Sequence, residues 1–327
     1  MKQFSLLIVL CVGMLVAGQA QVFFQNTMHP YVRFAYNPAA AGFALPGMEE
    51  GANFTLMGRQ QWLGIEGAPR TPLFAFQTPL PQKYGAIGAV LASDQTGPIS
   101  NSWLDVSYAY RLELGERLRL SIGVAGGVKQ VAINPEGFIY DQSGGIDPII
   151  PLATQGVVVP NLNAGLYLTS VDPATGREGN YFLGISGQNL LEPNIEGLLG
   201  VSGIGDDSNV DRSFALMGGY RFDLSTRLSL QPMLMMQTDG VGAPQTMASV
   251  YLNYKPIVVG INYRMNSGES VGGMVGFNIS DRTFFGYSYD YPTTALSAAG
   301  DLHSHEIILS YTLPGTGARG RGKGVDV

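Results

Sequence analysis

The sequence predicts an all-β fold, a transmembrane antiparallel β-barrel of about 14 strands with a plug-like N-terminal segment. Three observations predict it: a charge-poor, aromatic composition, strands that alternate apolar and polar residues, and connections that alternate between long and short. They divide the chain into a signal peptide at 1–20, an N-terminal segment at 21–52, a barrel at 53–313 and a tail at 314–327.

The first 20 residues have the pattern of a secretory signal peptide. Lys2 precedes a nearly continuous apolar run at 4–16, and Gly18 and Ala20 fit the small-residue cleavage rule, so we expect cleavage after Ala20. The run is too short for a spanning helix, and the residues before Cys11 do not suit lipoprotein processing. Cys11 is the only cysteine, so the expected mature chain has no disulfide and no thiolate metal site.

The composition favours a membrane barrel over a soluble domain. Charged residues make up 13% of the chain, about half the roughly 25% of average globular proteins, whereas there are 44 glycines, 16 tyrosines and 15 phenylalanines. Beyond the signal peptide no apolar run is long enough for a transmembrane helix. A secreted β-sandwich is the alternative. The net charge of −6 argues against nucleic acid as a partner.

Apolar and polar residues alternate along most of the chain. Leu104, Val106 and Tyr108, for example, alternate with Asp105 and Ser107, which gives a strand one apolar and one polar face. Most runs reach about 10 residues, the length that a tilted strand needs to cross a bilayer. The predicted strands lie at about 53–62, 71–80, 83–94, 100–114, 116–132, 159–170, 180–190, 211–223, 225–238, 245–254, 256–266, 270–280, 282–291 and 304–313.

The connections between these strands alternate in length. Those after odd-numbered strands are long, as at 133–158 and 191–210, and those after even-numbered strands are tight, as at residues 115 and 224. Long extracellular loops and short periplasmic turns are typical of outer-membrane barrels. An even strand count then places both chain ends in the periplasm.

The two ends of the expected mature chain differ in character. The segment at 21–52 is rich in aromatic residues, such as Tyr31 and Phe34, and is too apolar for a free tail, so we expect it to pack inside or under the barrel. The glycine-rich tail at 314–327 is expected to be disordered. Its basic residues are expected to meet an acidic periplasmic partner or the cell wall; they are Arg319, Arg321 and Lys323.

Several charged residues face the lumen by parity, and they are Asp105, Arg111, Glu113, Arg119, Lys129, Arg264 and Asp290. Balanced charges suit internal salt bridges that close a lumen, and they equally suit a selective channel. For Asp290, between lipid-facing tyrosines, we favour a lumen salt bridge over a functional site.

For each candidate catalytic or metal-binding group, a purely structural role is favoured over a functional one. His303 and His305, near Asp301 and Glu306, could ligate zinc, and Ser304 between them is the only hint of a hydrolase. Calcium could bind the acidic loop of Asp206, Asp207, Asn209 and Asp211, but its spacing matches no known calcium loop. The run from Gly317 to Lys323 imitates a phosphate loop without its strand–helix context. We therefore expect no catalytic, cofactor or metal site.

Several stretches are more specific than a barrel requires. Residues 59–71 read R-Q-Q-W-L-G-I-E-G-A-P-R-T, and this run resembles the R-x-Q-W-x-G-x-x-G-A-P-x-T signature of the PorP/SprF family of the type IX secretion and gliding machinery. The run N-P-A-A-A-G at 37–42 and the turn D-Q-T-G-P at 94–98 are similar to further family segments. Later matches follow in the family's order at 108–110, 231–232, 286–291 and 305–311, so the resemblance covers almost the whole expected mature chain.

The resemblance implies a non-enzymatic outer-membrane barrel that acts in protein export. Its implied partners are outer-membrane lipids, periplasmic lipoproteins of the machinery or peptidoglycan, and a large surface adhesin. The tail beyond the last strand departs from the family pattern, as do the two long outer loops. A passive or substrate-selective diffusion channel is the alternative function.

The signature run has two readings that the sequence leaves open. Gly64 and Gly67 permit unusual backbone angles, Pro69 stiffens the return of the chain, and Trp62 suits an interfacial aromatic girdle. The run from Arg59 to Thr71 spans the end of the first strand, its outer loop and the start of the second strand, and it either folds into the barrel mouth for stability or docks a partner.

Overall fold

A computed structural model describes residues 26–80, 84–134, 154–195, 209–266, 269–294 and 302–313. The expected signal peptide, the residues of the phosphate-loop imitation, and Asp206 and Asp207 of the acidic loop lie outside this part of the chain. The tail residues Arg319, Arg321 and Lys323 lie outside it as well.

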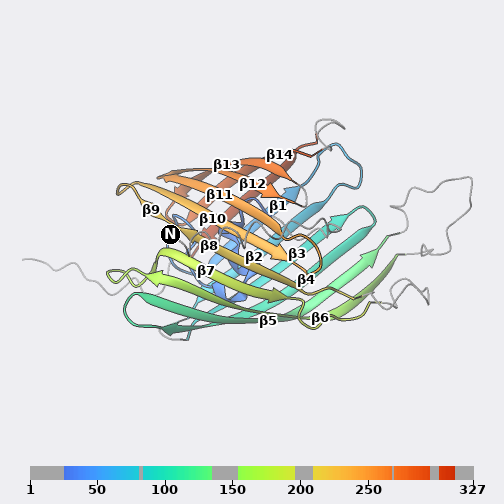
Figure 1. Cartoon of the computed structure of the whole chain (residues 1–327), viewed down its shortest axis with the longest axis horizontal. Helices are drawn as coiled ribbons and strands as arrows, with labels where there is room; N and C mark the ends of the chain where they lie inside the picture. Colours follow the sequence, from blue (N-terminus) through green and yellow to red (C-terminus); the bar gives the residue numbers. More distant parts are fainter. Residues whose placement is uncertain are drawn as a thin grey trace, which may run out of the picture.

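The described strands form one closed antiparallel sheet (Figure 1). Each strand pairs with its neighbour in the chain, and the sheet closes where β15 pairs with β1. The strands are β1 (Asn53–Gln60), β2 (Arg70–Pro79), β3 (Ala86–Thr96), β4 (Ile99–Glu113), β5 (Leu118–Ile133), β6 (Gln155–Val171), β7 (Glu178–Gln188), β8 (Ser213–Tyr220), β9 (Phe222–Asp223), β10 (Leu228–Thr238), β11 (Gln245–Tyr254), β12 (Ile257–Met265), β13 (Ser270–Ser280), β14 (Thr283–Pro292) and β15 (Ser304–Thr312).

β8 and β9 are two pieces of one barrel strand. Both pair with β10, and the strand is interrupted at Arg221, whose backbone N–H donates to Asn180 O on β7. Counted in this way the barrel has the predicted 14 strands. Closure leaves no unpaired sheet edge, which a strand in lipid could not tolerate.

The two faces of the wall differ as the alternation predicts. Along β15, Ile307, Leu309 and Tyr311 are 44–52% exposed on the outside, whereas Glu306 and Ser310 on the inside are fully buried. The exposed apolar side chains form the surface that an outer-membrane barrel presents to lipid. No helix among the described residues is both long and apolar enough to cross a membrane.

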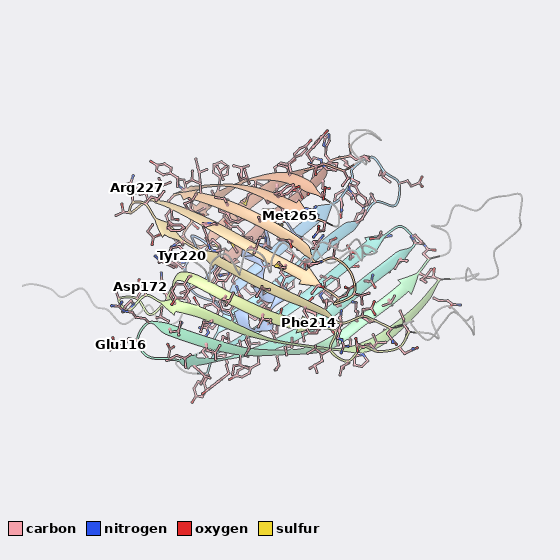
Figure 2. The ribbon with its side chains drawn as sticks, in the orientation of Figure 1. Glu116, Asp172, Phe214, Tyr220, Arg227 and Met265 are labelled. Atoms are coloured by element: carbon pink, nitrogen blue, oxygen red, sulfur yellow. The ribbon has the colours of Figure 1, made fainter. Side chains whose placement is uncertain are left out.

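The two ends of the barrel carry different connections. Figure 2 shows the turn residues Glu116, Asp172 and Arg227 together at one end, which we call the short-turn end. The connection at 61–69 lies at the opposite end, where β5 and β7 also end, and we call it the long-loop end.

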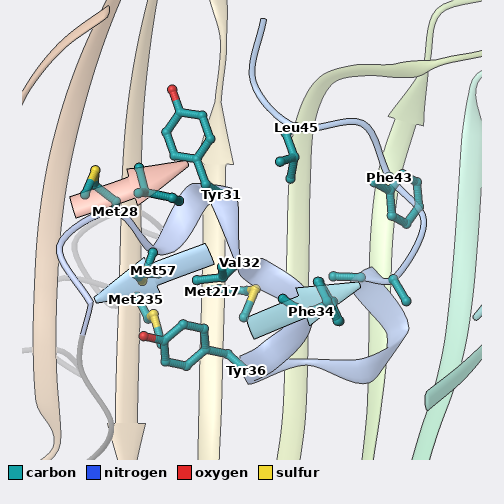
Figure 3. Packing of buried hydrophobic residues seen from close by; sticks show 14 of the residues in the cluster. Met28, Tyr31, Val32, Phe34, Tyr36, Phe43, Leu45, Met57, Met217 and Met235 are labelled. Carbon is teal, nitrogen blue, oxygen red and sulfur yellow. The ribbon is translucent and has the colours of Figure 1, made fainter. Parts of the chain in front are cut away.

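The chain before β1 folds inside the barrel. It forms η1 (His29–Tyr31), α2 (Arg33–Tyr36) and η2 (Pro38–Ala40), and most residues from 26 to 48 are buried. We call residues 26–48 the plug. Figure 3 shows its residues Met28, Tyr31 and Tyr36 beside Met57 and Met235 of the wall. The ring of Tyr31 stacks on Phe284 of β14, with 4.1 Å between centroids. The main apolar cluster therefore lies between the plug and the inner wall.

Several strand boundaries differ by a few residues from the sequence prediction, and two of these differences have a clear physical reason. The first strand ends at Gln60, not at residue 62, because Trp62 adopts a left-handed backbone with a φ of 45°. β6 begins at Gln155, four residues before the predicted 159, because residues 155–158 already pair with β5. There Val159 joins Val131 and Ile133 in a second apolar cluster.

Candidate functional site

Four buried charged side chains meet on the inner wall, and we call them the anchor cluster: Arg59 of β1, Arg264 of β12, Asp290 of β14 and Glu306 of β15. Arg59 Nη1 lies 2.7 Å from Asp290 Oδ2 and 3.2 Å from Glu306 Oε2. Arg264 Nη2 lies 3.8 Å from Asp290 Oδ2. Two guanidinium groups thus face two carboxylates, the balance that buried charge requires.

The anchor cluster holds the start of the plug. The backbone N–H groups of Thr27 and Met28 donate to the two Glu306 oxygens, at 3.0 and 2.8 Å. The Thr27 hydroxyl donates to Asp290 Oδ2 at 2.7 Å, and the Tyr251 hydroxyl donates to Thr27 O at 3.0 Å. Hydrogen bonds to an ionised acceptor are about twice as strong as neutral ones, so this contact fixes the chain firmly.

A second charged contact holds the middle of the plug. Both Nη atoms of Arg33 donate to the Glu178 carboxylate of β7 at 2.9 Å, and Arg33 also donates to the Tyr167 hydroxyl. The Tyr167 hydroxyl donates to Glu178 at 2.7 Å, and the Arg33 guanidinium lies 5.0 Å from the centroid of Phe182. In the same stretch of the plug, burial lowers the pKa of His29 to about 3, so this imidazole is neutral at physiological pH.

The third contact is formed by the run N-P-A-A-A-G at 37–42. The Asn37 amide donates to Leu166 O and Ile185 O, and its Oδ1 accepts from Ala39 N. The wall opposite is glycine: an added Cβ would lie 2.2 Å from Asn37 Oδ1 at Gly165 and 2.1 Å from Ala39 N at Gly123. The plug therefore touches the backbone of the wall, which only glycine allows.

The chain leaves this contact in a left-handed turn. Gly42 has a φ of 77°, and its N–H donates to Gln77 Oε1 at 2.8 Å. Arg111 donates to Ala41 O, and its guanidinium lies 4.4 Å from the centroid of the Phe43 ring. Arg111, predicted to face the lumen, thus binds the plug and not a lumen carboxylate.

We call residues 61–71 of the signature run the signature loop. It lies at the long-loop end and is hydrogen-bonded to neighbouring segments. Trp62 N donates to Ser304 Oγ at 3.3 Å, and Gly97 N donates to Gly67 O at 2.7 Å. Thr71 donates to Asp94 Oδ1 at 2.6 Å, while Pro69 O accepts from Gln61 N. Gly64 and Gly67 have φ values of 105° and 73°. Leu63 and Ile65, in contrast, are 54% and 40% exposed at the rim.

The structure brings some sequence candidates together and separates others. Arg59 and Asp290 meet in the anchor cluster, whereas the other candidates belong to the signature loop, which ends in the first residues of β2: Trp62, Gly64, Gly67, Pro69 and Thr71. The sequence reasoning did not single out Glu306 or Arg33 as contact residues. Parity could have found Glu306, which lies directly opposite Arg59 in the β1–β15 register. Arg33 could not be found in this way, because the plug is irregular and its sequence has no alternating pattern that would predict where a side chain points.

The residues proposed for chemistry at 303–306 do not form a site. Glu306 and Ser304 point inward, whereas the His305 ring packs on tyrosines of β14, with its Nδ1 2.7 Å from Tyr287 Oη. Neighbouring strand residues face opposite sides of the wall, so serine and histidine cannot act together. Among the residues that the structure describes, no group of three potential ligands could hold a metal ion.

Two cavities border the plug from opposite ends. The larger, of about 510 Å³, lies at the short-turn end beside plug residues 44–48. The smaller, of about 230 Å³, lies at the long-loop end beside Ala35. Within the part of the chain that the structure describes, the plug lies between these two cavities.

A closed barrel with an apolar outer face and a filled lumen defines an outer-membrane β-barrel protein. A family model described as "Type IX secretion system membrane protein PorP/SprF" matches residues 17–311, and the chain belongs to this family. The resemblance read from the sequence motifs is thereby confirmed. A search of curated proteins finds no match.

Solved structures of outer-membrane proteins share the fold. The toluene transporter TbuX of Ralstonia pickettii has a TM-score of 0.51 and 12% identity, over 87% of this chain and 94% of that chain. The CymD monoaromatic hydrocarbon channel has a TM-score of 0.50 and 12% identity, over 90% and 95% of the two chains. At this identity the likeness shows the fold alone.

Proposed function

We propose that this protein is a non-enzymatic component of the type IX secretion and gliding machinery. In this role it anchors periplasmic parts of the machinery, or it assists the export and surface attachment of an adhesin. Membership of the PorP/SprF family supports the role in secretion. The long-loop end then faces the cell exterior and the short-turn end faces the periplasm.

The filled lumen is the observation that carries the proposal. Charged contacts at Arg33 and Arg59 and a glycine-lined contact at Asn37 hold the plug across the barrel. A diffusion channel needs a continuous polar path, whereas an anchor needs a rigid body with exposed rims. The arrangement suits the anchor.

The rims supply the candidate docking surfaces. At the outer rim the signature loop, with Trp62, Gly64, Gly67, Pro69 and Thr71, holds Leu63 and Ile65 in exposed positions. Exposed apolar side chains on a hydrogen-bonded loop suit a protein partner such as an adhesin. For the periplasmic side we propose that Arg319, Arg321 and Lys323 meet an acidic lipoprotein or the peptidoglycan.

A passive or substrate-selective diffusion channel is the second candidate. The cavities at the two ends of the lumen favour it, because they would join if the plug moved. The channel reading therefore requires that the plug leave its buried contacts.

Mass spectrometry of the culture medium and cell surface tests the proposal in a strain that lacks this gene. Loss of all type IX cargo supports the machinery anchor, and loss of one or a few adhesins supports a dedicated export partner. The complemented strain restores the cargo in either case. If every cargo is unchanged, the secretion role is wrong and the diffusion channel becomes the leading reading.

A further inference from the structure

The cavity at the long-loop end has a lining unlike the rest of the lumen. It has a volume of about 230 Å³, close to the roughly 300 Å³ at which small-molecule pockets begin. Amide and carboxylate side chains line it beside one indole ring and one ammonium group. They include Asn101, Trp103, Asp105, Lys129, Asn161 and Asn163.

Hydrogen bonds hold part of this lining in place. Asn161 donates to both oxygens of Asp105 at 2.9 and 3.1 Å, and Asn163 donates to Asp105 Oδ2 at 3.0 Å. Asn163 Oδ1 accepts from the backbone N–H of Asn189 at 2.9 Å. Asp105, Asn161 and Asn163 are only 7–8% exposed, so this wall of the cavity is preorganised.

Other polar groups of the cavity make no hydrogen bond or close ion pair among the described residues, although Asp105 and Asp94 attract the Lys129 ammonium group. Among the described residues, no hydrogen bond reaches the Asn101 amide or Asn161 Oδ1, and no carboxylate lies within salt-bridge distance of Lys129. The cavity therefore offers free donors and free acceptors side by side. Trp103 adds an aromatic face, and it packs against the main apolar cluster.

This mixture selects the chemistry of a ligand. A sugar hydroxyl both donates and accepts hydrogen bonds, so it can use Asn101, Asn161 and Lys129 together. The C–H face of a sugar ring is apolar and can pack on an indole. An inorganic anion would meet the carboxylates of Asp94, Asp105 and Asp211 against a single lysine, and a hydrocarbon would leave the polar groups unpaired.

We propose that the long-loop cavity binds a saccharide, with Trp103 stacking on the ring and Asn101, Lys129 and Asn161 bonding its hydroxyl groups. The site opens at the end of the barrel that we assign to the cell surface, where free sugars and the glycan of lipopolysaccharide are both at hand. It does not rest on the role in secretion, since the cavity is described by its lining alone.

Tryptophan fluorescence measures this binding directly. The chain has two tryptophans, so Trp62→Phe leaves Trp103 as the reporter inside the cavity. The purified full-length barrel in detergent would be titrated with galactose, mannose, N-acetylglucosamine and maltotriose. A further titration uses the polysaccharide that mild acid releases from lipopolysaccharide, and glutamate and glycylglycine serve as non-sugar probes.

We expect a saturable change with saccharides, weakened about tenfold in Asn101→Ala and in Lys129→Met. Asn253→Ala, which lines the cavity at the other end, should bind as the parent does. Saturation with the simple sugars identifies a free saccharide as the ligand, and saturation with the released polysaccharide alone identifies the lipid-borne glycan. The proposal is wrong if no saccharide saturates the signal of the correctly folded barrel, or if glutamate or glycylglycine binds in its place.

Discussion

Arg59 contacts both carboxylates that hold the start of the plug. Its side chain is 3% exposed, and its guanidinium group contacts the side chains of Asp290 and Glu306, which are 2% and 0% exposed. An ion pair buried to this degree adds little net stability by itself, but removal of one partner leaves an uncompensated buried charge. Arg264, at 3.8 Å from Asp290, is too distant to replace it fully.

We therefore expect Arg59→Met to destabilise the barrel by about 3–5 kcal/mol. Urea titration of the heat-modifiable folded band on gels measures this change. Arg221→Gln is the matched control, because Arg221 pairs with Asp223 where both side chains are at least 39% exposed, and such pairs contribute little. Equal effects of the two substitutions would contradict the assigned role of the anchor cluster.

At the residue scale, strand parity predicted which face of the wall a side chain occupies. It placed Asp290 and Arg264 on the inner face, and both are buried in the lumen. It could not pair Arg33 with Glu178, because an irregular segment has no period and its contacts lie 145 residues apart. Nor did it assign Arg111 to the plug, since parity gives the face of a side chain and not its partner.

At the scale of the elements, the plug and the wall fit because the wall is glycine where they touch. Gly123 and Gly165 face the run at 37–42 with no space for a side chain. A larger residue there must displace the plug or distort the strand. The strand is hydrogen-bonded to a neighbour on each side and is therefore stiffer than the plug, so we expect the plug to move. The similarity of this run to a family segment thus has a physical reason in the contact.

Gly123→Val should expose the plug while the barrel still folds. The measurement is maleimide labelling of Ala40→Cys, a plug position that is 3% exposed, in a chain with Cys11→Ser. We expect slow labelling in the parent and fast labelling with Gly123→Val. Gly126→Val is the control on the same strand, because no atom lies within 4 Å of a Cβ added there. Labelling that stays slow in both variants would show that the contact at Gly123 does not hold the plug.

The strands themselves were largely predictable from periodicity. The pattern of β4, with Leu104, Val106 and Tyr108 outside, is fixed by the lipid on one face and the lumen on the other. The early start of β6 was not predictable, because it depends on pairing with β5 and on the cluster around Val131. The break at Arg221 likewise depends on a bond to β7.

At the scale of the whole molecule, the barrel and its plug form one body. The buried Glu306 carboxylate of the wall accepts hydrogen bonds from Thr27 and Met28 of the plug. The plug in turn buries its aromatic residues against the wall. The fold class followed from composition and pattern, whereas the apolar N-terminal segment was expected only to pack inside or under the barrel. Which residues seal the lumen did not, because three contacts distant in sequence determine it.

Single-channel conductance in planar bilayers tests most directly whether the plug seals the barrel. We expect no steady conductance for the full chain and a large, stable conductance for a variant that lacks residues 26–48, provided that both give the folded, heat-modifiable form. If the full chain conducts as well as the deletion variant, the lumen is open, and the protein works as a diffusion channel.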